Sequence, residues 1–227
     1  MQDLAARVAA EVRDPDALRL AGDALSAAGA PDLGATLRPG GYLFATIHRA
    51  ENREPSALAV WPVILSDAVK PGHPVILALH PGTRVALAAA GISLPPGVRV
   101  VEPLGYRTSL TLQLHAAAVI TDSGGVQRES AELGTPCLVP RSTTEWLEAV
   151  EGSTGRMVVV GLDRARASLA LTRLTPRPGS EALARTRADG LRLSPAGASQ
   201  RIVDALGWVQ RTMRRPTPRI SPARPAP

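Results

Sequence analysis

Six short runs of apolar residues, separated by longer segments with helical periodicity, constrain the fold of this chain more than any other feature. The runs are continuous rather than alternating, which is typical of strands that are buried on both faces of a sheet. They are Tyr42–Ile47, Pro74–Leu79, Val98–Val101, Ala117–Thr121, Cys137–Val139 and Met157–Val160. Strand and helix in regular alternation predict an α/β fold, a Rossmann-like parallel sheet with helices on both faces and right-handed crossovers.

The segments between the apolar runs predict the helices. Between the strands these are Ser56–Val69, Thr83–Ala90, Thr108–Ala116, Gly125–Leu133 and Thr144–Glu151, and after Gly161 they are Ala165–Arg173, Glu181–Asp189 and an amphipathic segment from Ala198 to Thr212. Ser56 is the predicted N-cap of the first of them, and Pro71-Gly72 ends that helix. We predict three parts: a lead-in of short helices (1–38), the sheet domain (39–210) and a disordered Pro/Arg tail (211–227).

Composition excludes several classes of protein. Of the 227 residues, 44% are hydrophobic and 20% are charged, which is typical of a globular chain rather than a disordered one. No apolar stretch approaches 18 residues, and the first residues lack a basic region followed by an apolar one, so we expect neither a membrane span nor a secretory signal. Cys137 is the only cysteine, which excludes an internal disulfide and a thiolate metal cluster and favours the cytoplasm. No His, Cys or Asp spacing indicates a metal site.

The formal net charge of +6 raises the question of a nucleic-acid partner. The tail alone carries five arginines and no acid, and the remaining residues hold 21 basic and 20 acidic side chains. No aromatic residue is interleaved with the arginines of the tail, as an RNA-binding segment would require. The charge pattern therefore argues against nucleic acid as a partner and for a solvated extension.

The residues that follow the predicted strands carry the candidate chemistry, because ligands of open parallel sheets bind beyond the carboxyl ends of the strands. Asp122 and Ser123 follow one strand, and Gly124-Gly125 then opens a helix. A glycine pair at this position lets backbone N–H groups approach an anion, and Glu129 lies one turn further, where its carboxylate can accept hydrogen bonds from a ribose. The segment predicts a diphosphate-ribose site; the alternative is a tight turn with a capping side chain.

Polar residues also follow the first predicted strand, in the order His48-Arg49-Ala50-Glu51-Asn52. His48 can neutralise a phosphate oxygen or carry a proton near neutral pH, and Arg49 suits bidentate contact with a phosphate or carboxylate. The alternative is a polar loop that caps the next helix. Because polar groups are costly to bury and contribute little to packing, we interpret this loop as functional.

Two further strand ends add residues to the same edge. His80 follows the second strand, where Thr83 offers the alternative of an ordinary helix cap. Arg141, Thr144 and Glu145 follow the fifth, where the alternative is that a Ser, a Thr and a Glu of this segment partly resemble a capping box. We treat His73, His115 and Cys137 as structural.

These motifs, in this order, resemble the C-terminal domain of the non-hydrolysing UDP-N-acetylglucosamine 2-epimerases. The resemblance is carried by Thr46-Ile47-His48-Arg49-Ala50-Glu51-Asn52, His80-Pro81-Gly82-Thr83-Arg84, Glu102-Pro103-Leu104-Gly105-Tyr106, Asp122-Ser123-Gly124-Gly125-Val126-Gln127 and Thr144-Glu145-Trp146. It runs from about Gly41 to Leu162. It implies one half of the two-domain arrangement called GT-B, with UDP-GlcNAc or UDP as the bound molecule.

The resemblance also implies a reaction and roles for individual residues. The family interconverts UDP-GlcNAc and UDP-ManNAc by elimination and re-addition of UDP, with no redox cofactor, in the biosynthesis of cell-surface polysaccharides. By resemblance the Ser123-Gly124-Gly125 turn holds the diphosphate, Glu129 holds the ribose, and His48 is the catalytic residue that assists the departure of UDP. Arg49 and His80 match positions that touch a second, activating UDP-GlcNAc.

The remaining candidates lie on the sugar side or at the activating site by resemblance: Glu51, Arg141, Thr144 and Glu145. The chain also departs from the family pattern, since Arg128 stands where an acid is usual and Trp146-Leu147 where Arg-Pro is frequent.

The family's N-terminal domain supplies the carboxylates that move the C2 proton, and no pair of acids in residues 1–35 matches them. We therefore expect the nucleotide-binding half of an epimerase, with a separate N-terminal catalytic half as partner and a homodimer as a further expectation. Two alternatives stay open. One is another UDP-sugar enzyme, either a hydrolysing epimerase or half of a glycosyltransferase, and the other is a non-catalytic orphan binding domain.

Overall fold

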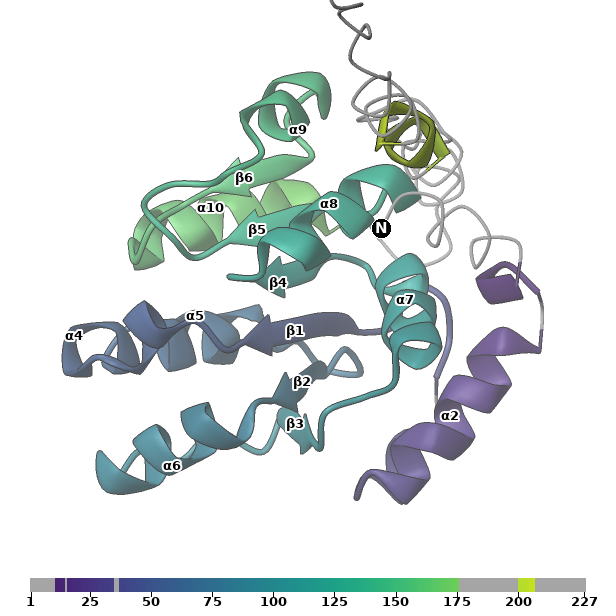
Figure 1. Cartoon of the computed structure of the whole chain (residues 1–227). Helices are drawn as coiled ribbons and strands as arrows, with labels where there is room; N and C mark the ends of the chain where they lie inside the picture. Colours follow the sequence, from purple (N-terminus) through teal and green to yellow (C-terminus); the bar gives the residue numbers. More distant parts are fainter. Residues whose placement is uncertain (1–10, 15, 35–36, 176–199, 207–227) are drawn as a thin grey trace, which may run out of the picture.

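A six-stranded sheet forms the centre of the molecule in the computed structural model, which describes residues 11–14, 16–34, 37–175 and 200–206 (Figure 1). The strands are β1 (Leu43–Ile47), β2 (Val75–Leu79), β3 (Val98–Val101), β4 (Val119–Thr121), β5 (Cys137–Val139) and β6 (Met157–Val159). All five neighbouring pairs are parallel. Each strand coincides with a predicted apolar run, and the predicted α/β, Rossmann-like fold is confirmed.

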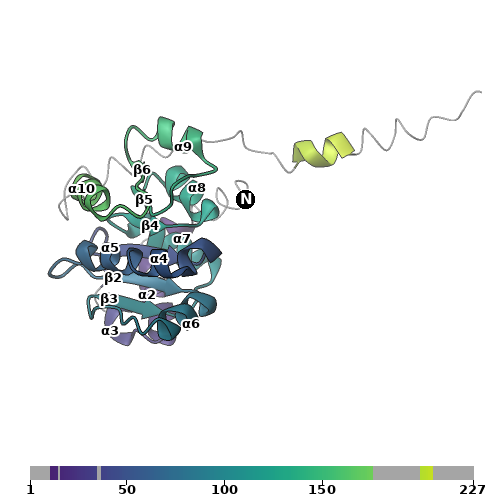
Figure 2. The same ribbon diagram turned by 90° about the vertical axis from the view of Figure 1, so that its left-hand side faces the viewer.

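The helices divide between the two faces of the sheet (Figures 1 and 2). One face is covered by α4 (Pro55–Leu58), α5 (Trp61–Ala68), α6 (Pro81–Ala89) and α10 (Arg164–Leu174). The other is covered by α2 (Ala17–Ala27), α3 (Pro31–Gly34), α7 (Tyr106–His115), α8 (Gly124–Leu133) and α9 (Leu147–Gly152). Strand side chains alternate between the two cores: Phe44 lies with α2 and α7, whereas Ala45 lies with α5.

The strand order β3-β2-β1-β4-β5-β6 decides where a ligand can bind. The chain builds outward from β1 to β3, returns to the centre, and then builds outward in the other direction from β4. Since β1 and β4 are neighbours, the loops that leave their carboxyl ends diverge to opposite faces of the sheet. Such a point of reversal leaves a crevice beyond the strand ends, and it is the usual ligand position in open parallel sheets.

The predicted helix Ser56–Val69 is wrong as a single element, because it divides into α4 and α5. Pro62 is the second residue of α5; it has no N–H to donate into a preceding turn, so a continuous helix would lose a hydrogen bond there. The predicted N-cap is also wrong. Glu54 is the cap residue, with no side-chain cap bond, and Pro55 starts the helix.

The predicted helix Thr144–Glu151 begins three residues too early, since α9 starts at Leu147. The other predicted helices between strands agree with the structure to within two residues at each end. Of the predicted closing helix, residues 200–206 are helical. The predicted helix Glu181–Asp189 and the predicted tail (211–227) lie outside the described residues.

Burial and backbone conformation explain two features of the core. Cys137 is buried in β5, where burial raises the pKa of its thiol to about 12, so it behaves as a small apolar side chain. Gly134 ends α8 with a φ of +73°, a left-handed conformation that glycine adopts without strain. In the described part of the chain, no helix has both the length and the apolar character that crossing a membrane requires.

Candidate functional site

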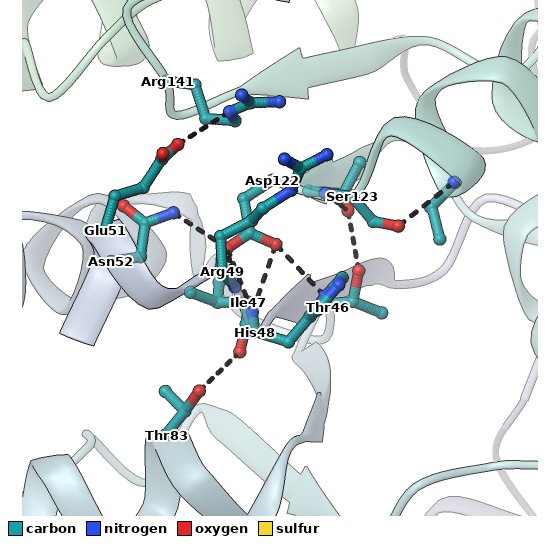
Figure 3. Close-up of polar contacts among 12 residues, drawn as sticks. Thr46, Ile47, His48, Arg49, Glu51, Asn52, Thr83, Asp122, Ser123 and Arg141 are labelled. Carbon is teal, nitrogen blue, oxygen red and sulfur yellow. Dashed lines mark hydrogen bonds and ion pairs between the residues drawn. The ribbon is translucent and has the colours of Figure 1, made fainter.

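The loops after β1 and β4 meet at the carboxyl edge of the sheet (Figure 3). Thr46 and Thr121, near the ends of these strands, share a hydrogen bond of 2.7 Å between their hydroxyls. The Thr121 hydroxyl also accepts a hydrogen bond of 3.0 Å from the backbone N–H of Ser123. The two strand ends are thus tied together directly below the loops that carry the candidate residues.

Asp122 is the centre of this junction. Its side chain is fully buried, and its carboxylate accepts hydrogen bonds from the backbone N–H groups of His48, at 3.0–3.1 Å, and Arg49, at 2.8 Å. The Asn52 side-chain amide donates a further bond of 2.8 Å. The ring atom Nδ1 of His48 lies 3.3 Å from the same carboxylate, and the His48 side chain is 42% exposed. The loop after β1 is therefore built around an acid that the β4 loop supplies.

The amino end of α8 has free donors for an anion. Ser123 is the N-cap, and its hydroxyl oxygen accepts from the N–H of Val126 at 3.4 Å, while the Gln127 N–H is bonded to the Ser123 carbonyl. Of the first N–H groups of the helix, those of Gly124 and Gly125 are then available to a ligand. Because the helix dipole also favours negative charge at this end, the geometry suits a phosphate group.

A chain of four alternating charges crosses the edge beside this helix end. Arg49 Nη2 lies 3.0 Å from the Glu145 carboxylate, which Arg141 Nη1 approaches to 2.9 Å. Arg141 Nε in turn lies 2.8 Å from the Glu51 carboxylate (Figure 3). Arg141 is mostly buried, whereas both acids are about half exposed. The ion pairs fix the two arginines between the β1 and β5 loops.

Glu145 lies directly against the glycine pair. A Cβ atom on Gly124 would stand 3.2 Å from a Glu145 carboxylate oxygen, 3.3 Å from the Trp146 ring nitrogen and 3.5 Å from Arg49 Nη2. A side chain at this position would therefore press on the ends of these three side chains, which would have to shift by a few tenths of an ångström. The hydrogen bonds from Arg141 lower the pKa of Glu145 to about 2, so this acid is a carboxylate at neutral pH.

Thr144 reaches the same cluster through α8. Its hydroxyl donates a hydrogen bond of 2.5 Å to the side-chain oxygen of Gln127 and accepts one of 3.1 Å from the backbone N–H of Trp146. Neither bond is a helix cap, because α9 begins after Trp146 and has no side-chain cap. The capping-box alternative for this segment is therefore wrong, and Glu145 turns to Arg141 instead of to the helix.

His80 is the N-cap of α6 and accepts a hydrogen bond of 3.1 Å from the N–H of Gly82 through Nδ1. Thr83 is not the cap. It is buried, and its hydroxyl donates to the carbonyl of Ile47 at 3.0 Å, which fixes α6 against the end of β1. The ring centroids of His48 and His80 are 6.3 Å apart. The end of β2 thus adds a second imidazole to the cluster.

Glu129 is separate from this charge chain. It lies on α8 with 8% of its surface exposed and accepts a hydrogen bond of 2.8 Å from Gln113 of α7. Burial raises the pKa of its carboxyl group, and it also raises the pKa of the neighbouring Tyr106 hydroxyl to about 12. The structure brings His48, Arg49 and Glu145 together with Gly124, whereas Glu129 marks a second, more buried position further along the same helix.

Three residues that were not singled out in the sequence hold the cluster together. All three, Asp122, Asn52 and Gln127, are at most 2% exposed. Asp122 accepts hydrogen bonds from the backbone of His48 and Arg49 and from the Asn52 amide, and Gln127 accepts one from Thr144. A signal for Asp122 was present, since an acid at the end of an apolar strand can only be buried if several donors surround it. The sequence does not show which donors these are. No group of three or more His, Cys, Asp and Glu side chains among the described residues could hold a metal ion.

Comparisons with known proteins bear on the family and the fold of the chain. The model of the UDP-N-acetylglucosamine 2-epimerase family matches residues 14–207. The UDP-2,3-diacetamido-2,3-dideoxy-D-glucuronate 2-epimerase of Pseudomonas aeruginosa is 40% identical over 139 residues, which are 58% of this chain and 38% of that protein.

Solved structures show the same fold. UDP-GlcNAc 2-epimerase of Methanocaldococcus jannaschii, in complex with UDP-GlcNAc and UDP, aligns with a TM-score of 0.64 and 23% identity over 85% of this chain and 53% of that one. UDP-GlcNAc 2-epimerase of Neisseria meningitidis, bound to UDP-GlcNAc, aligns with a TM-score of 0.57 and 27% identity over 74% and 44%. This chain thus spans about half the length of these solved structures, and its match with the Pseudomonas protein spans about two fifths of that relative.

Proposed function

This chain belongs to the UDP-N-acetylglucosamine 2-epimerase family, and from that membership we propose that its carboxyl-edge cluster binds the UDP part of a nucleotide sugar for 2-epimerisation. The observation that carries the proposal is the amino end of α8. Its two glycine N–H groups lie at the reversal point of the sheet. Arg49 lies close to Gly124, and His48 follows β1, the strand that pairs with β4. These are the donors that a diphosphate needs.

In the proposed reaction a base removes the C2 proton of the sugar and the C1–O bond to the diphosphate breaks, which gives UDP and a 2-acetamidoglucal, whose double bond lies between C1 and C2. The N–H groups of Gly124 and Gly125 and the guanidinium of Arg49 stabilise the charge that develops on the leaving diphosphate. His48, in its doubly protonated imidazolium form, is the proposed proton donor to the departing phosphate oxygen, and the neutral imidazole remains after the transfer. Protonation of C2 from the other face and return of UDP complete the epimerisation.

The base that removes the C2 proton is expected outside the charge chain described above. Glu51 and Glu145 are the acids of that chain, and each is ion-paired with Arg141. A carboxylate whose pKa is about 2, as for Glu145, is a weak base, and a proton on carbon demands a stronger one. We therefore propose that a second domain, of the kind the family places N-terminally, completes the active site.

Two related substrates compete within this proposal. UDP-GlcNAc is the ligand named for the two solved structures, whereas the Pseudomonas relative at 40% identity acts on a 2,3-diacetamido glucuronate. The second substrate adds a carboxylate to the sugar, and its binding requires a donor beyond those that hold the diphosphate. Arg141 and Arg49 are the arginines of the charge chain, and both are already paired with Glu145.

The test is a titration and a product assay on the 227-residue chain. Isothermal titration calorimetry with UDP should give saturable binding, weakened about tenfold in Glu129→Ala. Glu132→Ala is the matched control, because Glu132 lies on the same helix but pairs with Arg128. Unchanged UDP affinity in Glu129→Ala would refute the ribose contact, and no binding by the unmodified chain would refute the site.

The product assay uses NMR with each of the two UDP-sugars. Appearance of UDP-ManNAc would mean that the chain contains its own base, whereas UDP binding without turnover is the outcome expected for a half that needs its partner domain. Free ManNAc would identify a hydrolysing epimerase, and sugar transfer to an acceptor a glycosyltransferase. A homodimer and a cytoplasmic location remain predictions, which size-exclusion chromatography and cell fractionation would test.

A further inference from the structure

We propose that Asp122 is the positioning residue of His48: it holds the imidazole with the Nδ1–H directed at the buried carboxylate, so that Nε2 is the nitrogen presented to the ligand. The proposal rests on the proposed function for the identity of that ligand. The orientation itself depends only on contacts within the chain (Figure 3).

The surroundings of Asp122 consist of donors. The carboxylate is 0% exposed, and its oxygens accept from the His48 N–H, the Arg49 N–H and the Asn52 amide. An asparagine of the same shape would turn an NH2 group toward at least one of these N–H groups. The site therefore requires an acceptor on both oxygens, which an ionised carboxylate provides and an amide does not.

The imidazole of His48 is the fourth group at this carboxylate. Its Nδ1 lies 3.3 Å from Oδ1, and the nitrogen that faces a carboxylate is the one that carries hydrogen. Nε2 is the other end of a ring whose side chain is 42% exposed, whereas the acid behind it is inaccessible. The ring thus meets the carboxylate on its buried side, and the rest of the side chain is exposed.

Asp122 also holds the backbone of His48, from which the imidazole ring extends. Because the backbone N–H groups of His48 and Arg49 both end on this carboxylate, the first two residues after β1 cannot move away from β4 without leaving a buried charge unpaired. Asn52 adds a third anchor, and its own carbonyl accepts a hydrogen bond of 2.9 Å from the buried Trp61 ring. The position of His48 is therefore set by long-range contacts rather than by its own loop.

The experiment measures the tautomer of His48 directly. Long-range 1H–15N NMR spectra of the side chains, recorded on the 227-residue chain at pH 8.5 where an ordinary histidine is neutral, distinguish Nδ1–H from Nε2–H; the His48 signals are assigned by their loss in His48→Gln. The expected result is Nδ1–H for the unmodified chain and a shift to Nε2–H in Asp122→Asn. Nε2–H in the unmodified chain, or an unchanged tautomer in Asp122→Asn, would overturn the proposal.

Asn52→Ala is the control for a merely structural effect, because it loosens the same loop but leaves the carboxylate facing His48. It should retain the Nδ1–H tautomer, and loss of that tautomer would assign the effect to the loop and contradict the role of Asp122. If Asp122→Asn does not fold, the tautomer of the unmodified chain decides. UDP titration is a separate measurement. The Nδ1–H tautomer without UDP binding would support the positioning role of Asp122 and refute the proposed function. UDP binding with the Nε2–H tautomer would support the proposed function and refute the positioning role.

Discussion

The two edges of the same sheet are built differently. At the carboxyl edge, polar side chains are buried and share their partners: Asp122 and Gln127 are fully buried, and Arg141 is 9% exposed. At the amino edge, a hollow of about 570 Å³ is lined by residues such as Asp32, Arg99 and Lys70. In the Arg99–Asp32 ion pair there, Arg99 Nη2 contacts both carboxylate oxygens of Asp32, but both side chains are substantially exposed.

From this difference we infer which edge of the sheet carries the function. Burying a polar network is costly unless every member is paired, and an apolar core would stabilise the fold at least as well. A chain that only needed to fold would have no reason to concentrate such a network at one edge. We therefore interpret the carboxyl edge as the site and the amino edge as ordinary surface, and the following variants test that contrast.

The largest expected effect is that of Asp122→Ala, which leaves three N–H donors without their acceptor at a fully buried position. We expect a loss of about 3–5 kcal/mol in the free energy of unfolding, measured by urea denaturation. Asp32→Ala, which removes an acid of the amino edge, should remain within experimental error of the unmodified chain. Similar losses in both variants would contradict the contrast between the edges.

Gly124→Ala tests the close approach at the amino end of α8. The added methyl group would meet Glu145, Trp146 and Arg49 at 3.2–3.5 Å, so we expect UDP affinity to fall about tenfold, or about 1.4 kcal/mol, by calorimetry. Gly105→Ala is the control, because Gly105 also stands at the start of a helix but has open space around its Cβ position. Equal UDP affinity in the Gly124 variant and the unmodified chain would mean that the diphosphate binds elsewhere.

Glu129→Gln should make the chain more stable at pH 7 while weakening UDP binding. Burial raises the pKa of Glu129 above its ordinary value of 4.5, so its contribution to stability is complete below that value and is lost as the pH rises through the raised pKa. Glutamine has no charge to bury and can still accept from Gln113. Thermal unfolding followed between pH 4 and 8 should show a smaller decline in the variant, and an identical decline would show that another group causes it.

Glu145→Gln should have the smallest effect on stability. Since Arg141 lowers the pKa of Glu145 to about 2, the charged form contributes above the ordinary pKa of 4.5 and this contribution is lost as the pH falls from there toward 2. The side chain is 47% exposed, so solvent screening limits the contribution to less than about 1 kcal/mol. Urea unfolding at pH 3 and pH 6 measures it, and a difference larger for Glu145→Gln than for the unmodified chain would contradict the assignment.

The sequence predicted the strands well and the helix ends less well, for physical reasons. A buried strand has a local signature, a run of apolar residues, and each of the six runs became a strand. Pro62 also has a local signature, and the division between α4 and α5 was predictable from it. The start of α9 was not, because Thr144 and Glu145 are drawn away from the helix by Gln127 and Arg141, which lie on other elements.

For the site, the sequence determined which chemistry is present at each strand end: imidazoles after β1 and β2, a glycine pair after β4, and an arginine with an acid after β5. Only the tertiary structure decided which of these ends are neighbours. Asp122 contacts His48, which lies 74 positions away along the chain, because β4 pairs with β1. Strand order depends on how whole helices pack on the two faces of the sheet, so it cannot be predicted from local periodicity.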